Sequence, residues 1–284
     1  MRTEKVELYQ HFNMIPPMGT STQLEILLPE KLEVQGKMRF CPAVLILPGG
    51  GYMGVSKREA EPIALRFLAK GYAVFMLRYS CYPHAYPVAL REAAMAMKYI
   101  RQQAPRLQIQ SNMVAAVGFS AGGHLCGTLG TRYDGEEVSD IASAEELRPD
   151  VLGLCYPVAV SWGRTHEGSF ERLAQGDQAL WEKLSLDRCV RPDMPPAFIW
   201  HTRVDATVPC RNSLILATAM EEAGVPFALH IYHQGEHGLS VADETVYPGE
   251  AVPAVSEDVY GWTDAMLGFF REQGLRIVDM ETLP

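Results

Sequence analysis

Several signals that would mark whole classes of protein are missing from this sequence of 284 residues. Its first residues contain no apolar stretch of the kind found in secretory leaders, and no uninterrupted apolar run is long enough to span a bilayer. Positive charge is also scarce: the formal net charge is −9 at pH 7, which argues against nucleic acid or an anionic membrane surface as a partner. We therefore expect a cytoplasmic protein that binds neither nucleic acid nor membranes. The composition leaves self-association into a homo-oligomer open.

Cysteine is sparse, and its spacing argues against metal and disulfide sites. The chain has six cysteines, none of which forms a C-x-x-C pair, and no histidine–cysteine cluster has the spacing of metal ligands. We expect free thiols, no required metal and no cofactor. The six cysteines are Cys41, Cys81, Cys126, Cys155, Cys189 and Cys210.

No linker rich in proline, glycine or serine, no internal repeat and no charged block divides the chain, so we expect one domain over residues 1–284. Helix and strand patterns alternate, as in the helix at 58–70, the strand at 72–77 and the helix at 88–102. This alternation predicts an α/β fold whose mostly parallel sheet is covered on both faces. Residues 157–191 interrupt it and are expected to form a small lid or pocket wall. That segment contains three large aromatic residues, Trp162, Phe170 and Trp181. Such aromatics more often pack inside a protein than contact a substrate, although a sugar ring would stack well on an exposed Trp162.

The pentapeptide Gly118-Phe119-Ser120-Ala121-Gly122 lies between a predicted strand at 113–117 and a predicted helix from residue 123 onward. A G-x-S-x-G sequence between strand and helix is typical of a nucleophile elbow, a strained turn that pushes the serine oxygen out of the sheet. The glycines are needed because the helix passes close to the strand. We predict that Ser120 is a nucleophile, with a purely structural serine as the alternative.

A nucleophilic serine needs a base, and the base needs a carboxylate to orient it. Asp205 follows a predicted strand at 197–201, and His237 follows the next predicted strand at 226–232. Because parallel strands place their carboxyl ends side by side, both residues should lie at the sheet edge that carries Ser120. The order serine, aspartate, histidine is the one this arrangement requires.

Other histidines and carboxylates compete for these roles. His233 lies in the same loop as His237 and is the main rival; Gly235 and Gly238 favour His237 because they let the loop fold back over the serine. Three further histidines, His124, His201 and His230, are expected to be packed or to point away from the serine. Two nearby carboxylates, Glu236 and Asp243, are expected to be solvated loop residues.

A run of three glycines, Gly49 to Gly51, follows Pro48 and a predicted strand at 43–47. Such a run lets the backbone approach a ligand closely, as in the HGGG oxyanion loop, here with proline in place of the histidine. We predict that the amides of Gly50 and Gly51, with that of Ala121, form an oxyanion hole. A flexible turn is the alternative; a phosphate loop is disfavoured because no Gly-Lys-Ser or Gly-Lys-Thr follows.

These motifs give the chain its resemblance to a known family. The matching stretches are Leu47-Pro48-Gly49-Gly50-Gly51-Tyr52, Arg58-Glu59-Ala60-Glu61-Pro62, the residues 118–125, the residues 200–209 and Gly235-Glu236-His237-Gly238-Leu239. The chain resembles α/β-hydrolases of the acetyl-esterase/lipase group, close to bacterial carbohydrate acetyl esterases that act on xylan or xylo-oligosaccharides. The resemblance implies an α/β-hydrolase fold and serine-dependent hydrolysis of small acyl esters, commonly acetyl groups on sugars. By position it assigns the nucleophile to Ser120, the acid to Asp205 and the base to His237.

The function expected is therefore removal of acetyl groups from carbohydrates through an acyl-enzyme, with a small-molecule ester as the partner. A formamidase or a feruloyl-type esterase on the same scaffold is an alternative that a substrate panel would separate. A catalytically silent binding protein is an alternative from another class, and lack of labelling by a serine-reactive phosphonate would favour it.

Overall fold

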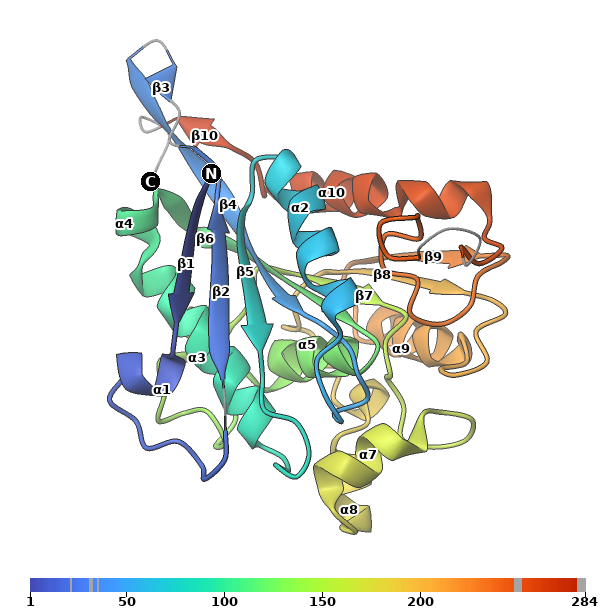
Figure 1. Ribbon diagram of the computed structural model, residues 1–284. Coiled ribbons are helices and arrows are strands. Elements are labelled where there is room, and N and C mark those ends of the chain that lie inside the picture. The colour runs from blue at the N-terminus through green and yellow to red at the C-terminus, as the bar shows by residue number, and fades with distance from the viewer. Residues whose placement is uncertain (21, 31–32, 35, 248–251, 280–284) are drawn as a thin grey trace.

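The computed structural model of this protein describes residues 1–20, 22–30, 33–34, 36–247 and 252–279. In this part of the chain one sheet runs in the order β1-β2-β5-β4-β6-β7-β8-β9, and two short strands, β3 and β10, pair with β4 (Figure 1). Its strands are β1 (Arg2–Val6), β2 (Gln23–Leu28), β3 (Glu33–Val34), β4 (Lys37–Leu47), β5 (Ala73–Arg78), β6 (Ile109–Phe119), β7 (Val151–Cys155), β8 (Ala197–Thr202), β9 (Phe227–Tyr232) and β10 (Val278–Asp279).

The sheet is mostly parallel, as the alternation of elements predicts. The strands from β5 through β4, β6, β7 and β8 to β9 pair in parallel, so their carboxyl ends share one edge. β1 and β2 extend the other side of the sheet with antiparallel pairing. These two strands were not predicted, although buried and partly exposed residues alternate along β2 with the period of two that marks a strand.

Helices cover both faces of the sheet (Figure 1). One face carries α2 (Glu61–Ala69) and α10 (Trp262–Glu272), and the other carries α3 (Val88–Gln102), α5 (Ala121–Arg132) and α9 (Arg211–Glu222). The shorter helices are α1 (Leu8–His11), η1 (Lys57–Glu59), α4 (Ala104–Leu107), α6 (Ala144–Leu147), α7 (Glu167–Ala174), α8 (Gln178–Lys183), η2 (Leu186–Arg188) and η4 (Glu257–Gly261). None of the helices in the described ranges is both long enough and apolar enough to cross a membrane.

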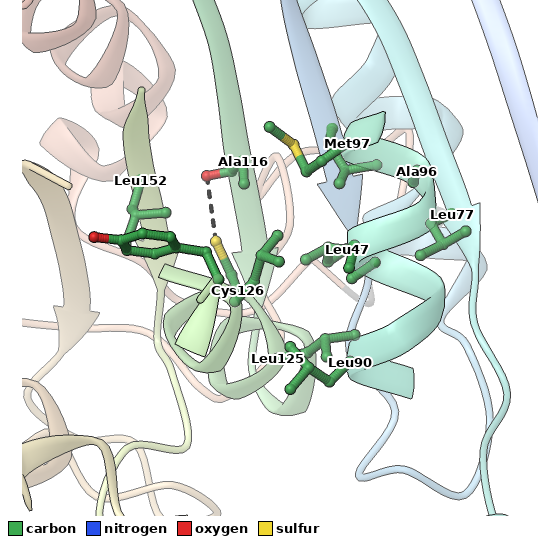
Figure 2. Packing of buried hydrophobic residues seen from close by; sticks show 14 of the residues in the cluster. Leu47, Leu77, Leu90, Ala96, Met97, Ala116, Leu125, Cys126 and Leu152 are labelled. Carbon is green, nitrogen blue, oxygen red and sulfur yellow. Dashed lines mark hydrogen bonds between the residues drawn. The ribbon is translucent and has the colours of Figure 1, made fainter. Parts of the chain in front are cut away.

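Two apolar cores lie on the two faces of the sheet. Along β4, Leu45 and Leu47 belong to the core under α3 and α5, whereas Val44 and Ile46 belong to the core under α2 and α10. Successive side chains of a strand point to opposite faces, so a strand buried on both sides is continuously apolar. Figure 2 shows the first core, where the Cys126 thiol lies 3.3 Å from the Ala116 carbonyl oxygen and bonds helix α5 to β6.

The predicted helix at 58–70 is wrong in one respect. It is divided into η1 and α2 at Ala60, where φ is −107° and ψ is −97°. Pro62 explains the division, since proline lacks an amide proton and fits only the first turn of a helix. The helix at 88–102 is confirmed, with α3 covering Val88–Gln102.

The segment at 157–191 forms α7, α8 and η2, and α7 and α8 lie beyond one edge of the sheet (Figure 1). Phe170 is fully buried against His124 and Trp181, so it packs inside the protein. Trp162 is 41% exposed. Its indole nitrogen donates a hydrogen bond to the Asp187 carboxylate, and the Arg211 guanidinium lies over its ring.

Candidate active site

Ser120 occupies a strained turn between β6 and α5. Its φ is +53° and its ψ is −119°, a conformation that residues with side chains rarely adopt, and its amide donates to the Cys155 carbonyl at 3.0 Å. The flanking glycines leave no room for side chains: a β carbon on Gly122 would lie 2.0 Å from the Leu47 carbonyl oxygen, and one on Gly118 would lie 2.1 Å from the Gly122 carbonyl oxygen. The close approach of α5 to the sheet is thus what requires glycine at these positions.

Asp205 follows β8 and is almost completely buried. Its Oδ1 accepts hydrogen bonds from the amides of Thr207 and Val208 at 3.0 and 2.9 Å. Its Oδ2 lies 2.6 Å from Nδ1 of His237 and 3.3 Å from Nε2 of His201. Burial alone would raise the pKa of this carboxyl, but the hydrogen bonds from His201 and His237 outweigh it and hold the pKa well below its usual range. Asp205 is therefore ionised at neutral pH.

His237 follows β9 and connects the other two residues. Its Nε2 lies 2.8 Å from Ser120 Oγ, while its Nδ1 faces Asp205. Gly235 and Gly238, with φ of +141° and +77°, adopt conformations open mainly to glycine as the loop turns back over the serine. His233 is exposed, and its ring contacts Gln234 instead. The structure thus brings Ser120, His237 and Asp205 into one hydrogen-bonded chain that does not include His233.

Two peptide groups of the glycine loop after β4 are fixed by hydrogen bonds within the loop. The carbonyl of Gly49 accepts from the Ser56 amide at 2.8 Å, and the carbonyl of Gly50 accepts from the Met53 amide at 3.0 Å. Because the amide of a trans peptide points opposite to its carbonyl, the amides of Gly50 and Gly51 point away from these bonds. Gly50 and Gly51 both line the cavity that contains Ser120. Ala121 is fully buried directly behind the serine, at the first position of α5.

The cavity at Ser120 has a volume of about 340 Å³ and a polar lining that sequence reasoning had largely missed. His166 and Arg172 reach it from the 157–191 segment, and Arg172 donates a 2.9 Å hydrogen bond to the Gly51 carbonyl. Burial, then the nearby His237, lowers the pKa of His166, which favours a neutral ring. Arg58 and Glu59 also line the cavity. In the sequence they belong to a stretch that matches the family, but no role was predicted for them. Trp162 is not among the lining residues.

The remaining predicted site features can be placed as well. His124 is buried on α5 and points away from the serine, with its ring nitrogens 2.8 Å from the Tyr52 hydroxyl and the Leu184 carbonyl. All six cysteines are free thiols. Within the described ranges, no group of three or more His, Cys, Asp or Glu residues is placed to share a metal ion.

A parallel sheet covered on both faces, with a hydroxyl, an imidazole and a carboxylate joined at its carboxyl edge, defines an α/β-hydrolase. Two family models match the chain: BD-FAE over residues 24–149 and the prolyl oligopeptidase family over residues 88–269, which is more than half of it. The crystal structure of an acetyl ester-xyloside bifunctional hydrolase from Caldicellulosiruptor lactoaceticus is 33% identical, with a TM-score of 0.82 over 96% of this chain and 97% of that one.

Two curated bacterial proteins are similar in sequence. Endo-1,4-beta-xylanase B of Butyrivibrio fibrisolvens is 35% identical over 220 residues, which is 72% of this chain and 34% of the relative. Acetylxylan esterase of Xylanibacter ruminicola is 31% identical over 206 residues, which is 69% of this chain and 41% of the relative. The chain thus spans well under half the length of these two relatives. It belongs to the prolyl oligopeptidase family of α/β-hydrolases.

Proposed function

We propose that this protein is a serine esterase that removes short acyl groups, acetyl above all, from carbohydrates such as xylo-oligosaccharides. The observation that carries the proposal is the chain of contacts from Ser120 Oγ to His237 at 2.8 Å and from His237 to Asp205 at 2.6 Å. Each element of a nucleophile, a base and an orienting acid is within hydrogen-bonding distance of the next.

In the first half of the reaction, His237 takes the proton of Ser120 as the serine oxygen attacks the ester carbonyl. Asp205 is a carboxylate and can only accept, so the proton of the neutral imidazole resides on Nδ1 and Nε2 offers its lone pair to Ser120. The same carboxylate stabilises the imidazolium that forms. His237 then gives its proton to the departing alcohol, which leaves an acetylated Ser120.

The oxyanion that forms on the carbonyl oxygen is stabilised by the amides of Gly50, Gly51 and Ala121. The direction of two peptide groups supports this assignment, because the carbonyls of Gly49 and Gly50 accept hydrogen bonds within the loop and the amides of Gly50 and Gly51 face the other way. The position of Ala121 at the start of α5 adds the partial positive charge of a helix N-terminus. Each such donor typically contributes about 3 kcal/mol to lowering the barrier.

In the second half, His237 activates a water molecule that attacks the acyl group on Ser120. The tetrahedral intermediate uses the same amides, and its collapse releases acetate and regenerates the serine hydroxyl. No chemistry beyond these side chains and the backbone is needed.

Carbohydrate is the proposed alcohol because the relatives are named for xylan and xyloside substrates and because the cavity is lined by polar groups suited to hydroxyls. The free thiols fit a reducing compartment, which supports a cytoplasmic enzyme acting on acetylated oligosaccharides small enough to be imported.

The test is a substrate panel of acetylated xylo-oligosaccharides, glucose pentaacetate and p-nitrophenyl esters, run with the wild type and Ser120→Ala. We expect activity on acetylated sugars and on p-nitrophenyl acetate, and a loss of at least about a thousandfold in Ser120→Ala with an unchanged circular dichroism spectrum. Residual activity within about tenfold of the wild type would contradict the role of Ser120. Turnover of p-nitrophenyl acetate without turnover of any acetylated sugar would contradict the carbohydrate substrate.

A further inference from the structure

A buried carboxyl group lies beside the site without a part in the proposed reaction. Glu59 ends η1, lines the cavity and is 4% exposed. Its Oε2 accepts a hydrogen bond from the Gly49 amide at 2.8 Å, and its Oε1 accepts one from the Tyr156 hydroxyl at 2.8 Å. A buried acceptor of this kind holds both donors in place, because a donor that moved away would be left unpaired.

The first bond clamps the glycine loop against the nucleophile. A β carbon on Gly49 would lie 2.7 Å from Glu59 Oε2 and 2.9 Å from Ser120 Cβ, so Gly49 is enclosed between these two side chains. The next residues in the chain are Gly50 and Gly51, whose amides we assign to the oxyanion hole. The residue that Glu59 holds is therefore the direct neighbour in the chain of these proposed donors.

The second bond reaches the histidine loop. While donating to Glu59, the Tyr156 hydroxyl accepts from the Ser240 amide at 3.0 Å, and Ser240 follows His237 by three residues. Burial, and then the adjacent Glu59, raise the pKa of Tyr156 well above its usual range, so the hydroxyl keeps the proton that it donates. The Tyr156 ring also meets the His237 ring edge to face, with centroids 5.2 Å apart. The Ser240 hydroxyl adds a second tie by donating to the Arg58 carbonyl.

We propose that Glu59 is a positioning residue that holds the oxyanion loop and the His237 loop in register with each other, acting through Gly49 and Tyr156. These loops follow β4 and β9, which are separated in the sheet by β6, β7 and β8, so no direct strand pairing joins the two loops. Attack on the ester needs the base and the oxyanion donors at once, and a shift of about 1 Å can lower the rate a hundredfold. The inference rests on the proposed function, since it assigns Glu59 to the same reaction.

Three substitutions distinguish the hydrogen bond between Glu59 and Gly49 from the hydrogen bond between Glu59 and Tyr156. Glu59→Ala removes both acceptors. Tyr156→Phe removes the link to the histidine loop and leaves the bond to Gly49. Glu59→Gln keeps the shape and one acceptor oxygen for the Gly49 amide, but it replaces the second oxygen by an NH2 donor, so the Tyr156 hydroxyl loses the acceptor for its proton.

On p-nitrophenyl acetate we expect kcat/KM to fall about a hundredfold in Glu59→Ala and about tenfold in Glu59→Gln and in Tyr156→Phe, mainly through kcat. The kcat/KM of the double variant Glu59→Gln/Tyr156→Phe should lie within about twofold of that of either single variant, because both changes remove the same hydrogen bond. Affinity for a small alkylboronic acid, which forms a tetrahedral adduct on serine, should fall in proportion to kcat/KM.

Glu92 provides a matched control. It is also a fully buried carboxyl, on α3, and accepts hydrogen bonds from the amide and hydroxyl of Ser80 at 2.6 and 2.7 Å. Glu92→Gln should lower the melting temperature while kcat/KM, measured well below that temperature, stays within about twofold of the wild type.

The outcomes are distinguishable. If Glu59→Ala and Tyr156→Phe match Glu92→Gln, with lower stability but normal kcat and boronate affinity, Glu59 is merely structural and the inference is wrong. Should Glu59→Ala not fold, Tyr156→Phe and Glu59→Gln decide the matter by the same criteria. If the Ser120→Ala variant keeps the activity of the wild type, the proposed function is wrong, and the inference is wrong with it.

Discussion

His201 Nε2 lies 3.3 Å from Asp205 Oδ2, the same oxygen that lies 2.6 Å from His237 Nδ1. The His201 ring is fully buried and is held at both nitrogens, by the Ser213 hydroxyl and the Val208 carbonyl, each at 2.8 Å. The Asp205 carboxylate thus contacts two histidines, one held in place inside the protein and one that faces the cavity. His201 is fixed inside the protein and can only orient Asp205, whereas His237 faces the cavity and Ser120.

The two histidines of the loop after β9 make a matched pair for mutation. We expect His237→Ala to lower kcat/KM for p-nitrophenyl acetate by about a thousandfold or more, because the serine loses its base. His233→Ala should stay within about twofold, because His233 is exposed and its ring nitrogen contacts Gln234. The opposite result for the two variants would transfer the role to His233.

The lowered pKa of Asp205 predicts a pH dependence of stability. A carboxyl whose pKa is lower in the folded than in the unfolded protein stabilises the fold above the unfolded pKa of about 3.9, and this contribution is lost as the pH falls toward the folded pKa. The wild type should therefore be more stable than Asp205→Asn at pH 7 and pH 5, and the gap should narrow by about 1 kcal/mol at pH 3.

Urea unfolding of both proteins at the three pH values measures this gap, and the other carboxyls cancel because they titrate in both. A gap that stays constant from pH 7 to pH 3 would show that the pKa of Asp205 is not lowered by folding.

Acyl length should be discriminated steeply. The cavity at Ser120 measures about 340 Å³, and Met53 is the one large apolar side chain among its described lining residues, so a long acyl chain finds no apolar slot. We expect kcat/KM to fall from acetate to butyrate to octanoate esters, with about 1–3 kcal/mol of discrimination for each methylene that clashes. EDTA should have no effect. Equal or faster turnover of p-nitrophenyl octanoate would place the enzyme with the lipases instead.

The elbow should tolerate no side chain at Gly122. A β carbon there would lie 2.0 Å from the Leu47 carbonyl oxygen, which belongs to the backbone of β4 and cannot move freely. Gly122→Ala should lower the free energy of unfolding by about 1–3 kcal/mol and abolish most activity. Gly261→Ala is the control, because nothing lies within 4 Å of its β carbon position and its φ is −87°. It should change stability by less than about 0.5 kcal/mol. Equal effects of the two changes in urea unfolding would refute this account of the elbow.

The fold was predictable where the signal is local. The α/β alternation predicts the parallel sheet, and α3 lies where its pattern places it. The signal was misinterpreted at residues 58–70, where Pro62 marks a helix start that the predicted helix ran through. The antiparallel strands β1 and β2 were missed although β2 alternates with the required period.

The sequence by itself determined which residues stand at the carboxyl ends of strands, and in what order. That information is local: a strand, a glycine turn and a helix mark Ser120, and polar loops after two later strands hold Asp205 and His237. Only the tertiary structure decided which histidine reaches the serine and what surrounds the pair. Glu59 meets Tyr156 across 97 positions of the chain, and Arg172 meets Gly51 across 121. Contacts at such separations follow from how the loops pack above the sheet, and no short period or motif in one sequence encodes them.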